Sequence, residues 1–194
     1  MDILTEAISI LPYVFARSQD ENFEEIQDDF IDWMENYAKV YQSNYRSNQK
    51  GYQSPDDFYL DKSFAPLLNY MSERILALVE TYKKHDDVEI DFIPRLSNMW
   101  FNINYKGSYN TYHSHPGSCL AGILYVNVPD NSGDITFHHH DEHCLSLTQH
   151  TTVSFDPEDG DMYLFPASMA HSVGMNEQEE PRFSIAFNLY EYYD

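Results

Sequence analysis

The chain has 194 residues, 42% of them hydrophobic, and its 32 acidic and 11 basic side chains give a net charge of −21. A field of this sign repels nucleic-acid phosphates and anionic membrane surfaces, so we expect neither partner, whereas it attracts metal cations to an open site. Twelve Phe and 16 Tyr supply enough apolar surface for a core, and we expect a single domain over residues 1–194.

The sequence gives no sign of a membrane span or of secretion. It has no run of about 18 apolar residues, and the opening stretch MDILTEAISILPYVF lacks the basic residues that begin a secretory signal. The two cysteines, Cys119 and Cys144, are too few for a disulfide framework. We therefore expect a cytoplasmic protein with reduced thiols.

Residues 1–95 are expected to form a helical N-terminal part with strand-like or loop interruptions. A first helix is predicted by apolar residues at helical spacing, namely Phe23, Ile26, Phe30, Trp33, Met34 and Tyr37. Residues 42–58 are rich in polar and turn-forming residues and predict a loop. A second helix should have Ser63 as its N-cap and an apolar stripe made of Leu67, Leu68, Met71, Ile75, Leu76, Leu78 and Val79. We interpret both stripes as core packing.

Residues 96–194 have a different pattern, in which short stretches of β-branched and aromatic residues alternate with Gly, Pro, Asn or Asp. The strand-like stretches are NMWFNINYKG, CLAGILYVNVP, GDITFHHH, TTVSFDP, GDMYLFPAS and RFSIAFNLYEYY. Residues 128–134 and 156–161 predict hairpin turns. Together these features predict an antiparallel sandwich or barrel.

Eight of the nine histidines lie between residues 113 and 171. In the stretch YHSHPGS, His113 and His115 are two residues apart, so a strand would turn both toward one face. His171 follows a later strand, and three imidazoles would converge at the mouth of a barrel if those strands are neighbours. Such a set suits Fe, Zn, Cu or Ni and leaves positions open on an octahedral ion. The alternative is that the pair is simply two polar residues at a strand end.

Two further polar residues share a face of the last predicted strand. Arg182 and Ser184 are two positions apart in PRFSIAFN. An inward-facing arginine is costly unless it is paired, and the carboxylate of an acidic small molecule would satisfy it through a bidentate contact. The alternative is an exposed ion pair with a glutamate from residues 177–180.

The stretch FHHHDEHC, residues 137–144, contains three consecutive histidines. On a strand only His138 and His140 would share a face. A second metal site is one interpretation, and a solvated loop is the other.

The order of these motifs resembles a family of 2-oxoglutarate- and Fe(II)-dependent oxygenases, which are prolyl-4-hydroxylase-like proteins found in bacteria and tailed phages. The resemblance covers about residues 97–190, through His-x-His-Pro-Gly-Ser, LAGILYVNVPDNSGDITF, LFPASMAHSV and PRFSIAFN. It implies a mainly β fold with α: a double-stranded β-helix, or jelly roll, with N-terminal helices packed on one sheet.

Position by position, the resemblance implies that His113 and His171 bind the iron. It also implies that Arg182, with Ser184 as its hydroxyl partner, binds the C5 carboxylate of 2-oxoglutarate. Tyr125 matches a strand tyrosine that reaches this cosubstrate from the side.

His115 stands where most of the superfamily carries Asp or Glu. The branch of the superfamily that the chain resembles is similar to it in using His-x-His. The resemblance therefore implies three histidine ligands. Asp134 is the carboxylate that would replace His115 if His115 is not a ligand.

The activity that the resemblance implies is hydroxylation with Fe(II), 2-oxoglutarate and O2, releasing succinate and CO2. The substrate stays open, and a prolyl or other protein side chain is one candidate. Two alternatives are a cupin-like metal-dependent enzyme that does not use 2-oxoglutarate and a non-catalytic jelly-roll protein. The oligomeric state is open, with a homodimer compatible with the sequence. A phage-encoded protein of this kind would act in the host cytoplasm.

Overall fold

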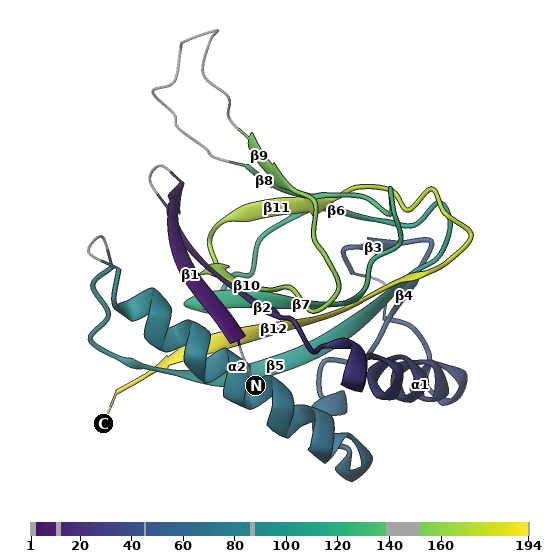
Figure 1. Cartoon of the computed structure of the whole chain (residues 1–194), viewed down its shortest axis with the longest axis horizontal. Helices are drawn as coiled ribbons and strands as arrows, with labels where there is room; N and C mark the ends of the chain where they lie inside the picture. The colour runs from purple at the N-terminus through teal and green to yellow at the C-terminus, as the bar shows by residue number, and fades with distance from the viewer. Residues whose placement is uncertain (1–2, 11–12, 45, 86–87, 139–151, 194) are drawn as a thin grey trace, which may run out of the picture.

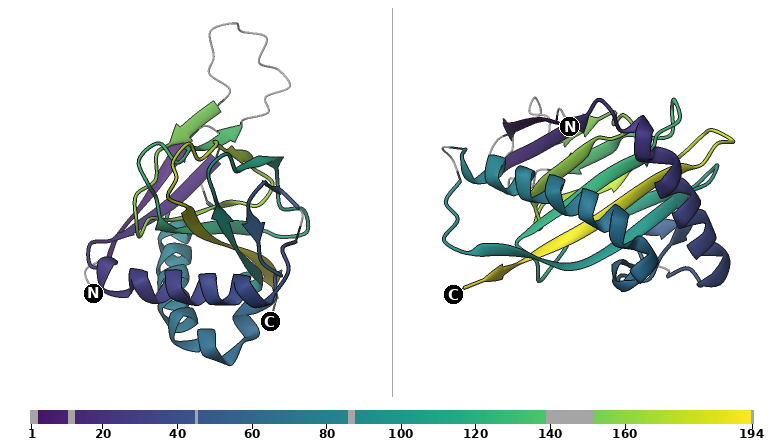
Figure 2. Two further views of the ribbon diagram at one scale, coloured as in Figure 1. Left: turned by 90° about the vertical axis from the view of Figure 1, so that its right-hand side faces the viewer. Right: turned by 60° about the horizontal axis from the view of Figure 1, so that its bottom comes forward.

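The computed structural model describes residues 3–10, 13–44, 46–85, 88–138 and 152–193. Over these residues it shows two β-sheets that face each other and two α-helices on the outer face of the larger sheet (Figure 1, Figure 2). The pairs within both sheets are antiparallel. This is the predicted jelly roll with N-terminal helices packed on one sheet.

The N-terminal part combines strands with helices. In chain order it comprises β1 (Ile3–Ile10), β2 (Tyr13–Asp20), α1 (Glu24–Val40), β3 (Asn48–Gln49), β4 (Tyr52–Gln53), the 3₁₀ turns η1 (Phe58–Leu60) and η2 (Lys62–Phe64), and α2 (Ala65–Lys83).

The rest of the described chain is built from strands. They are β5 (Ile93–Asn104), β6 (Tyr109–His113), β7 (Leu120–Asn127), β8 (Ile135–His138), β9 (Thr152–Phe155), β10 (Met162–Pro166), β11 (Ala170–Val173) and β12 (Arg182–Tyr192). Within the described residues the larger sheet has the order β1-β2-β10-β7-β12-β5-β4, and the smaller one β3-β6-β11-β8-β9.

Strand β7 shows how the sequence positions the two layers. Its side chains are almost all buried, because one face of the larger sheet meets the helices and the other meets the smaller sheet. Leu124 and Val126 pack in the helix-side core, whereas Ile123 and Tyr125 point between the sheets. This alternation is the period of two that a strand imposes, and it places Tyr125 in the interior.

The predicted helices are confirmed, with two corrections, one at the residue expected to cap α2 and one in its apolar stripe. The side chain of Asp61, not Ser63, caps the 3₁₀ turn that precedes α2 by accepting from the Ser63 backbone N–H at 2.9 Å. The Ser63 hydroxyl instead accepts from Trp33 Nε1 at 2.9 Å, and this hydrogen bond joins α1 to η2. Leu76, assigned to the apolar stripe, is 64% exposed, because it lies off the face of α2 that contacts the sheet.

The expectation of a helical N-terminal part is wrong for residues 3–20, which form β1 and β2. These two strands pair with each other over their full length, and β2 also pairs with β10. They extend the larger sheet at one edge. The strand conformation of residues 3–20 is therefore set by pairing with the free edge of β10, and not by the sequence pattern of these residues themselves.

Residues 128–134 and 156–161 form turns as predicted, but the strands that each turn connects do not pair with each other. Residues 128–134 join β7 of the larger sheet to β8 of the smaller one, and residues 156–161 join β9 to β10. Neither is a hairpin. The left-handed residues Asn131, Gly133 and Gly160 allow sharp reversals, which serve a crossing between sheets as well as a hairpin.

No helix in the described part of the chain is long and apolar enough to span a membrane.

Candidate active site

Two of the three candidate histidines lie opposite each other on paired strands. His113 is the last residue of β6, and His171 is the second residue of β11. The two strands are antiparallel, and His113 and His171 are direct partners in the register. Side chains of direct partners stand on the same face of a sheet, so both imidazoles point into the space between the sheets.

His115 reaches the same place by a different route from the one predicted. It does not continue the strand; it lies just beyond β6, and its backbone N–H donates to Ala167 O at 2.9 Å. Pro116 and Gly117 then form a turn in which Ser118 N–H donates to His115 O, and Gly117 has a φ of +89°. Pro followed by a left-handed Gly is the pattern of a type II turn.

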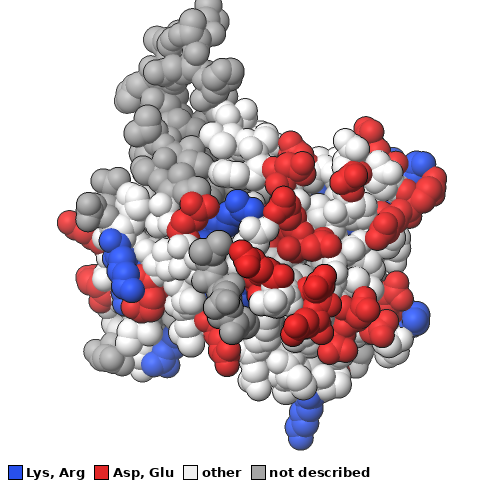
Figure 3. All heavy atoms as spheres, viewed as in Figure 1, with Lys and Arg blue, Asp and Glu red and all other residues white. Residues whose placement is uncertain are grey.

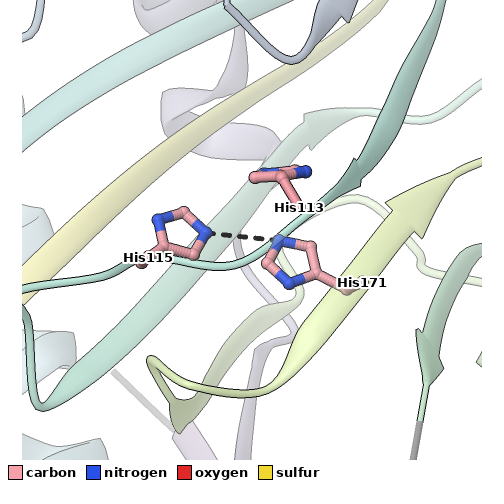
Figure 4. Close-up of side chains that lie close together, drawn as sticks. All are labelled: His113, His115 and His171. Atoms are coloured by element: carbon pink, nitrogen blue, oxygen red, sulfur yellow. Dashed lines mark hydrogen bonds between the residues drawn. The ribbon is translucent and has the colours of Figure 1, made fainter.

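The three imidazoles form one cluster (Figure 4). One ring nitrogen from each lies within 4.8 Å of the others, and His115 Nε2 is 3.3 Å from His171 Nε2. His115 and His171 are buried, and His113 is half-buried. Asp134 is exposed and lies outside this cluster.

Backbone carbonyls fix which nitrogen faces the centre of the cluster. His113 Nδ1 lies 2.7 Å from Thr111 O, and His171 Nδ1 lies 3.1 Å from Met169 O. A carbonyl can only accept, so each Nδ1 carries the proton and each Nε2 keeps its lone pair. His115 is held by its stack on Trp100, with ring centroids 5.5 Å apart.

The cluster favours uncharged imidazoles. Burial lowers the pKa of His113, an effect that its hydrogen bond to Thr111 opposes. Burial and the nearby His113 lower the pKa of His115 to about 4. The pKa of His171 falls well below its usual value, first because of burial and then because of the other two rings. Neutral imidazoles are the form that binds metal.

A pocket runs inward from the histidines between the two sheets. Arg182, Ser184 and Tyr125 line it together with His113 and His171. The structure thus places all the sequence-predicted site residues around one pocket, on β6, β7, β11 and β12 and in the turn after β6. Arg182 and Ser184 share a face of β12, as expected, and both are buried.

Arg182 forms no ion pair with any carboxylate in the described part of the chain. Its Nη1 donates to the backbone carbonyls of Ser132 and Gly133, with 2.7 Å to Gly133 O. The alternative partner, a glutamate of residues 177–180, is wrong: Glu179 binds Lys106, and Glu180 accepts from Asn127. Arg182 is only 2% exposed. Burial lowers its pKa, although a guanidinium stays charged in proteins.

The same end of the pocket holds buried polar atoms that lack a partner. Arg182 Nε and the hydroxyls of Tyr125 and Ser132 are buried, and within the described residues none has a hydrogen bond. Burial raises the pKa of Tyr125, while Arg182 opposes this effect. Unsatisfied buried polar groups are costly, and a positive charge beside hydroxyl donors is the arrangement that an organic carboxylate would satisfy.

Residues 98–188 match the family model described as "Putative 2OG-Fe(II) oxygenase". Over this segment the chain is therefore similar to that family. No sequence among the curated proteins matches the chain.

Solved structures of 2OG-Fe(II) oxygenases have the same fold. A prolyl hydroxylase from Trichoplax adhaerens, in complex with a hypoxia-inducible-factor peptide fragment, aligns with a TM-score of 0.67 at 12% identity, over 91% of this chain and 83% of its own. A Pseudomonas putida prolyl-4-hydroxylase aligns at 0.65 and 11%, over 95% and 96%. HygX from Streptomyces hygroscopicus, with nickel and 2-oxoglutarate bound, aligns at 0.66 and 13%, over 92% and 83%. At these identities the likeness shows the fold.

The cofactors in the name of the matched family fit the residues of this site. Two nitrogen ligands about 2.1 Å from one ion lie about 3.0–3.4 Å apart, and His115 Nε2 and His171 Nε2 are 3.3 Å apart. The histidines could therefore hold iron. The unpaired Arg182 and the free hydroxyl of Tyr125 could receive the carboxylate of 2-oxoglutarate.

The sequence reasoning missed polar residues of β5 that face the site. Trp100 and Asn102 line the inner pocket, and Asn110 of β6 lies beside them. Asn104 donates to Asn110 at 3.1 Å, and Asn48 donates to Asn104 at 2.9 Å, so a buried amide network supports this wall. The signal was present in NMWFNIN, where polar residues fall on every second position of a strand.

His138 lies outside the cluster. It ends β8, and its Nε2 lies 3.0 Å from Ser172 Oγ. His139, His140 and the rest of the predicted loop fall outside the described residues.

Proposed function

We propose that the chain is a 2-oxoglutarate-dependent hydroxylase whose iron ligands are His113, His115 and His171. The observation that carries the proposal is the position of three neutral imidazoles at the mouth of a pocket whose inner end holds a buried, unpaired arginine. The first feature suits a metal, and the second suits an acidic cosubstrate.

The other site residues have distinct roles in this proposal. Arg182 binds the far carboxylate of 2-oxoglutarate, and Ser184 and Tyr125 hydrogen-bond beside it. These contacts fix the direction of the cosubstrate, so that its keto acid end points toward the histidines. Thr111 O and Met169 O hold the ligand rings in one tautomer, as carbonyl partners of metal-bound histidines do.

When bound, Fe(II) would supply the O2 chemistry of the reaction. One oxygen atom of O2 would end in succinate, which forms with CO2 from 2-oxoglutarate, and the other would end in a hydroxyl group at a C–H position of the substrate. The protein has to orient the cosubstrate, bring the C–H bond to the site and exclude water. The side chains of Phe165, Ile123 and Trp100 line the pocket, and their apolar surfaces suit the exclusion of water.

The proposal is tested by anaerobic loading with Fe(II) and 2-oxoglutarate, followed by exposure to O2. We expect succinate to form in proportion to the 2-oxoglutarate consumed, even at a slow rate without a substrate. A protein that binds metal but neither binds nor consumes 2-oxoglutarate would instead match the cupin-like alternative. A protein that binds no metal would match the non-catalytic one.

The structural similarities do not choose the substrate. The similar structures named above include complexes with a peptide and with a metal and cosubstrate, and a further one contains hygromycin B. Proline hydroxylation is therefore one candidate among several for this chain.

Tyr125→Phe separates the proposed cosubstrate role from a structural one. The Tyr125 hydroxyl is buried without a partner, so its removal should leave the free energy of unfolding of the ligand-free protein unchanged or slightly higher. The dissociation constant for 2-oxoglutarate should rise roughly 10- to 150-fold, since a hydrogen bond to a charged group is worth about 1.5–3 kcal/mol. Urea denaturation and calorimetric titration measure the two effects.

Tyr163→Phe is the matched control. The Tyr163 hydroxyl donates to buried Asp161 at 3.2 Å, so this variant should lose stability and keep its affinity for 2-oxoglutarate. An unchanged affinity in Tyr125→Phe would remove Tyr125 from the cosubstrate site.

The metal-free protein should lose stability as the pH falls from about 6.5 to about 4. In the unfolded chain His115 takes up a proton near pH 6.5, but in the folded protein its pKa is about 4, so the unfolded state binds more protons in this window. For His115 alone the loss is on the order of 3 kcal/mol. Denaturation at several pH values measures it, and His115→Gln should flatten the slope. An equal slope in that variant would contradict the assignment.

A further inference from the structure

An outer basin opens onto the histidines from the solvent side. It has a volume of about 510 Å³, within the range of small-molecule sites, and His113, His115 and Trp100 line both this basin and the inner pocket. The C–H bond to be hydroxylated would have to lie next to these histidines. Resting on the function proposed above, the basin is where the substrate binds.

The lining of the basin is largely polar, and among the described residues Arg46 is its one ionic side chain. Five Ser or Thr side chains and three carboxamides, those of Gln53, Asn98 and Asn188, line it. Asn188 Nδ2 donates to Asn98 Oδ1 at 2.9 Å, and within the described residues Asn188 Oδ1 has no hydrogen-bond partner. Trp100 supplies a flat apolar surface. This differs from the mainly apolar lining of most ligand pockets and suits a ligand that carries many hydroxyl groups.

The charges around the basin disfavour ionic substrates. None of the described lining residues is Asp or Glu, although the chain has 32 acidic residues. The one lining cation, Arg46, forms an ion pair with Asp56 at 3.2 Å. Acidic side chains cover much of the molecular face that carries α1 (Figure 3), and the net charge is −21. An anionic substrate would be repelled, and a cationic one would find no carboxylate in the basin.

The backbone around the basin disfavours an extended peptide. Peptides commonly bind by adding a strand to a free sheet edge. The nearest edge strand of the larger sheet is β4, where Gln53 N–H donates to Ser43 Oγ at 3.0 Å and Gln53 O accepts from Asn44 N–H at 2.7 Å. Just before β3, Ser47 O already accepts from Thr111 N–H of β6 at 3.0 Å. These groups are not free to pair with a peptide.

We infer that the substrate is an uncharged, hydroxyl-rich ring, of the saccharide or polyol class. The carboxamides of Asn98, Gln53 and Asn188 hydrogen-bond its hydroxyl groups, and the indole of Trp100 contacts its C–H face. A C–H group of this ring then lies beside the histidines.

The inference is tested on protein loaded with Zn(II) and 2-oxoglutarate, with sugars that share a ring structure and differ in charge. Glucose, galactose and mannose are compared with their 2-amino sugars and their uronic acids, and with acetylated tripeptide amides, by saturation-transfer NMR. We expect binding to be concentrated in the neutral sugars. The inference is overturned if uronic acids or peptides bind better, and equally if no neutral sugar binds.

A designed charge gives a second readout. Ser97 lines the basin and is exposed, so Ser97→Asp adds a carboxylate there without replacing a buried group. It should shift the preference toward amino sugars by about fivefold, the effect of one exposed charge at contact distance. Ser168→Asp, exposed in a different groove, is the matched control and should leave the preference unchanged. Equal behaviour of the two variants would place the ligand elsewhere.

The 2-oxoglutarate assay keeps this inference apart from the function on which it rests. If the protein consumes 2-oxoglutarate with Fe(II) but binds no neutral sugar, the substrate class is wrong and the oxygenase proposal stands. If it neither binds metal nor consumes 2-oxoglutarate, the oxygenase proposal fails.

Discussion

Replacing His171 or His113 by Ala should abolish metal binding, or weaken it so far that the purified protein retains no stoichiometric ion. Each variant removes one of three imidazoles whose nitrogens lie within 4.8 Å of one another, and two neutral ligands bind a divalent ion poorly. Metal content after incubation with Fe(II) or Mn(II), and titration followed by Mn(II) electron paramagnetic resonance, measure the loss.

His138→Ala is the matched control for these variants. His138 lies on β8, directly beside β11, but its Nε2 bonds Ser172 and it is outside the cluster. This variant should bind metal like the parent. If His171→Ala keeps a stoichiometric ion with its fold intact, the three histidines are not the metal site.

His115 is the more informative position, because a carboxylate is the commoner third ligand of such sites. If it is a ligand, His115→Ala should lose most of the metal affinity, whereas His115→Asp should keep metal binding and 2-oxoglutarate turnover. A third neutral imidazole leaves the site with a charge of 2+, and Asp lowers it to 1+. Parent-like metal binding and turnover in His115→Ala would make His115 a bystander.

The local sequence pattern predicted the helices and the antiparallel strands well, because these signals are local, whereas the jelly roll itself was implied by the family resemblance. The helical stripe through Phe30 and Met34 is buried as expected, and the strand-like stretches after residue 96 coincide with strands. Residues 3–20 could not be placed from their own pattern, since their conformation depends on the unpaired edge of β10. The residue types at 128–134 likewise predict a turn, but they do not indicate that the chain crosses to the other sheet there.

The sequence singled out residues that the structure brings around one pocket, but it predicted their geometry less well. The spacing of His113 and His115 suggested two side chains on one face of a strand. The structure instead ends β6 at His113 and brings His115 back through a contact with Ala167 O. Trp100 and Asn102 belong to no sequence motif, so their position in the pocket wall can be recognised only when the neighbouring strands are placed.

Arg182→Ala should weaken 2-oxoglutarate binding by roughly 2–5 kcal/mol, because it removes one side of a buried charge pair that forms when the cosubstrate binds. Arg182 is the only described cation that lines the inner pocket, and it has no carboxylate partner of its own there. Calorimetric titration of the Mn(II)-loaded protein with 2-oxoglutarate measures the change. Metal affinity should stay close to that of the parent, which also shows that the variant is folded.

Arg182→Lys tests whether charge or geometry holds the cosubstrate. A lysine keeps the positive charge but cannot make the bidentate contact of a guanidinium, so its affinity should fall between the parent and Arg182→Ala. Arg95→Ala is the control for a lost cation, because Arg95 stacks on Tyr192 outside the pocket, 3.4 Å from the ring centroid. It should bind 2-oxoglutarate like the parent. If Arg182→Ala does so too while binding metal normally, the carboxylate lies elsewhere, and the unpaired guanidinium would then have to be explained by its bonds to Ser132 and Gly133 alone.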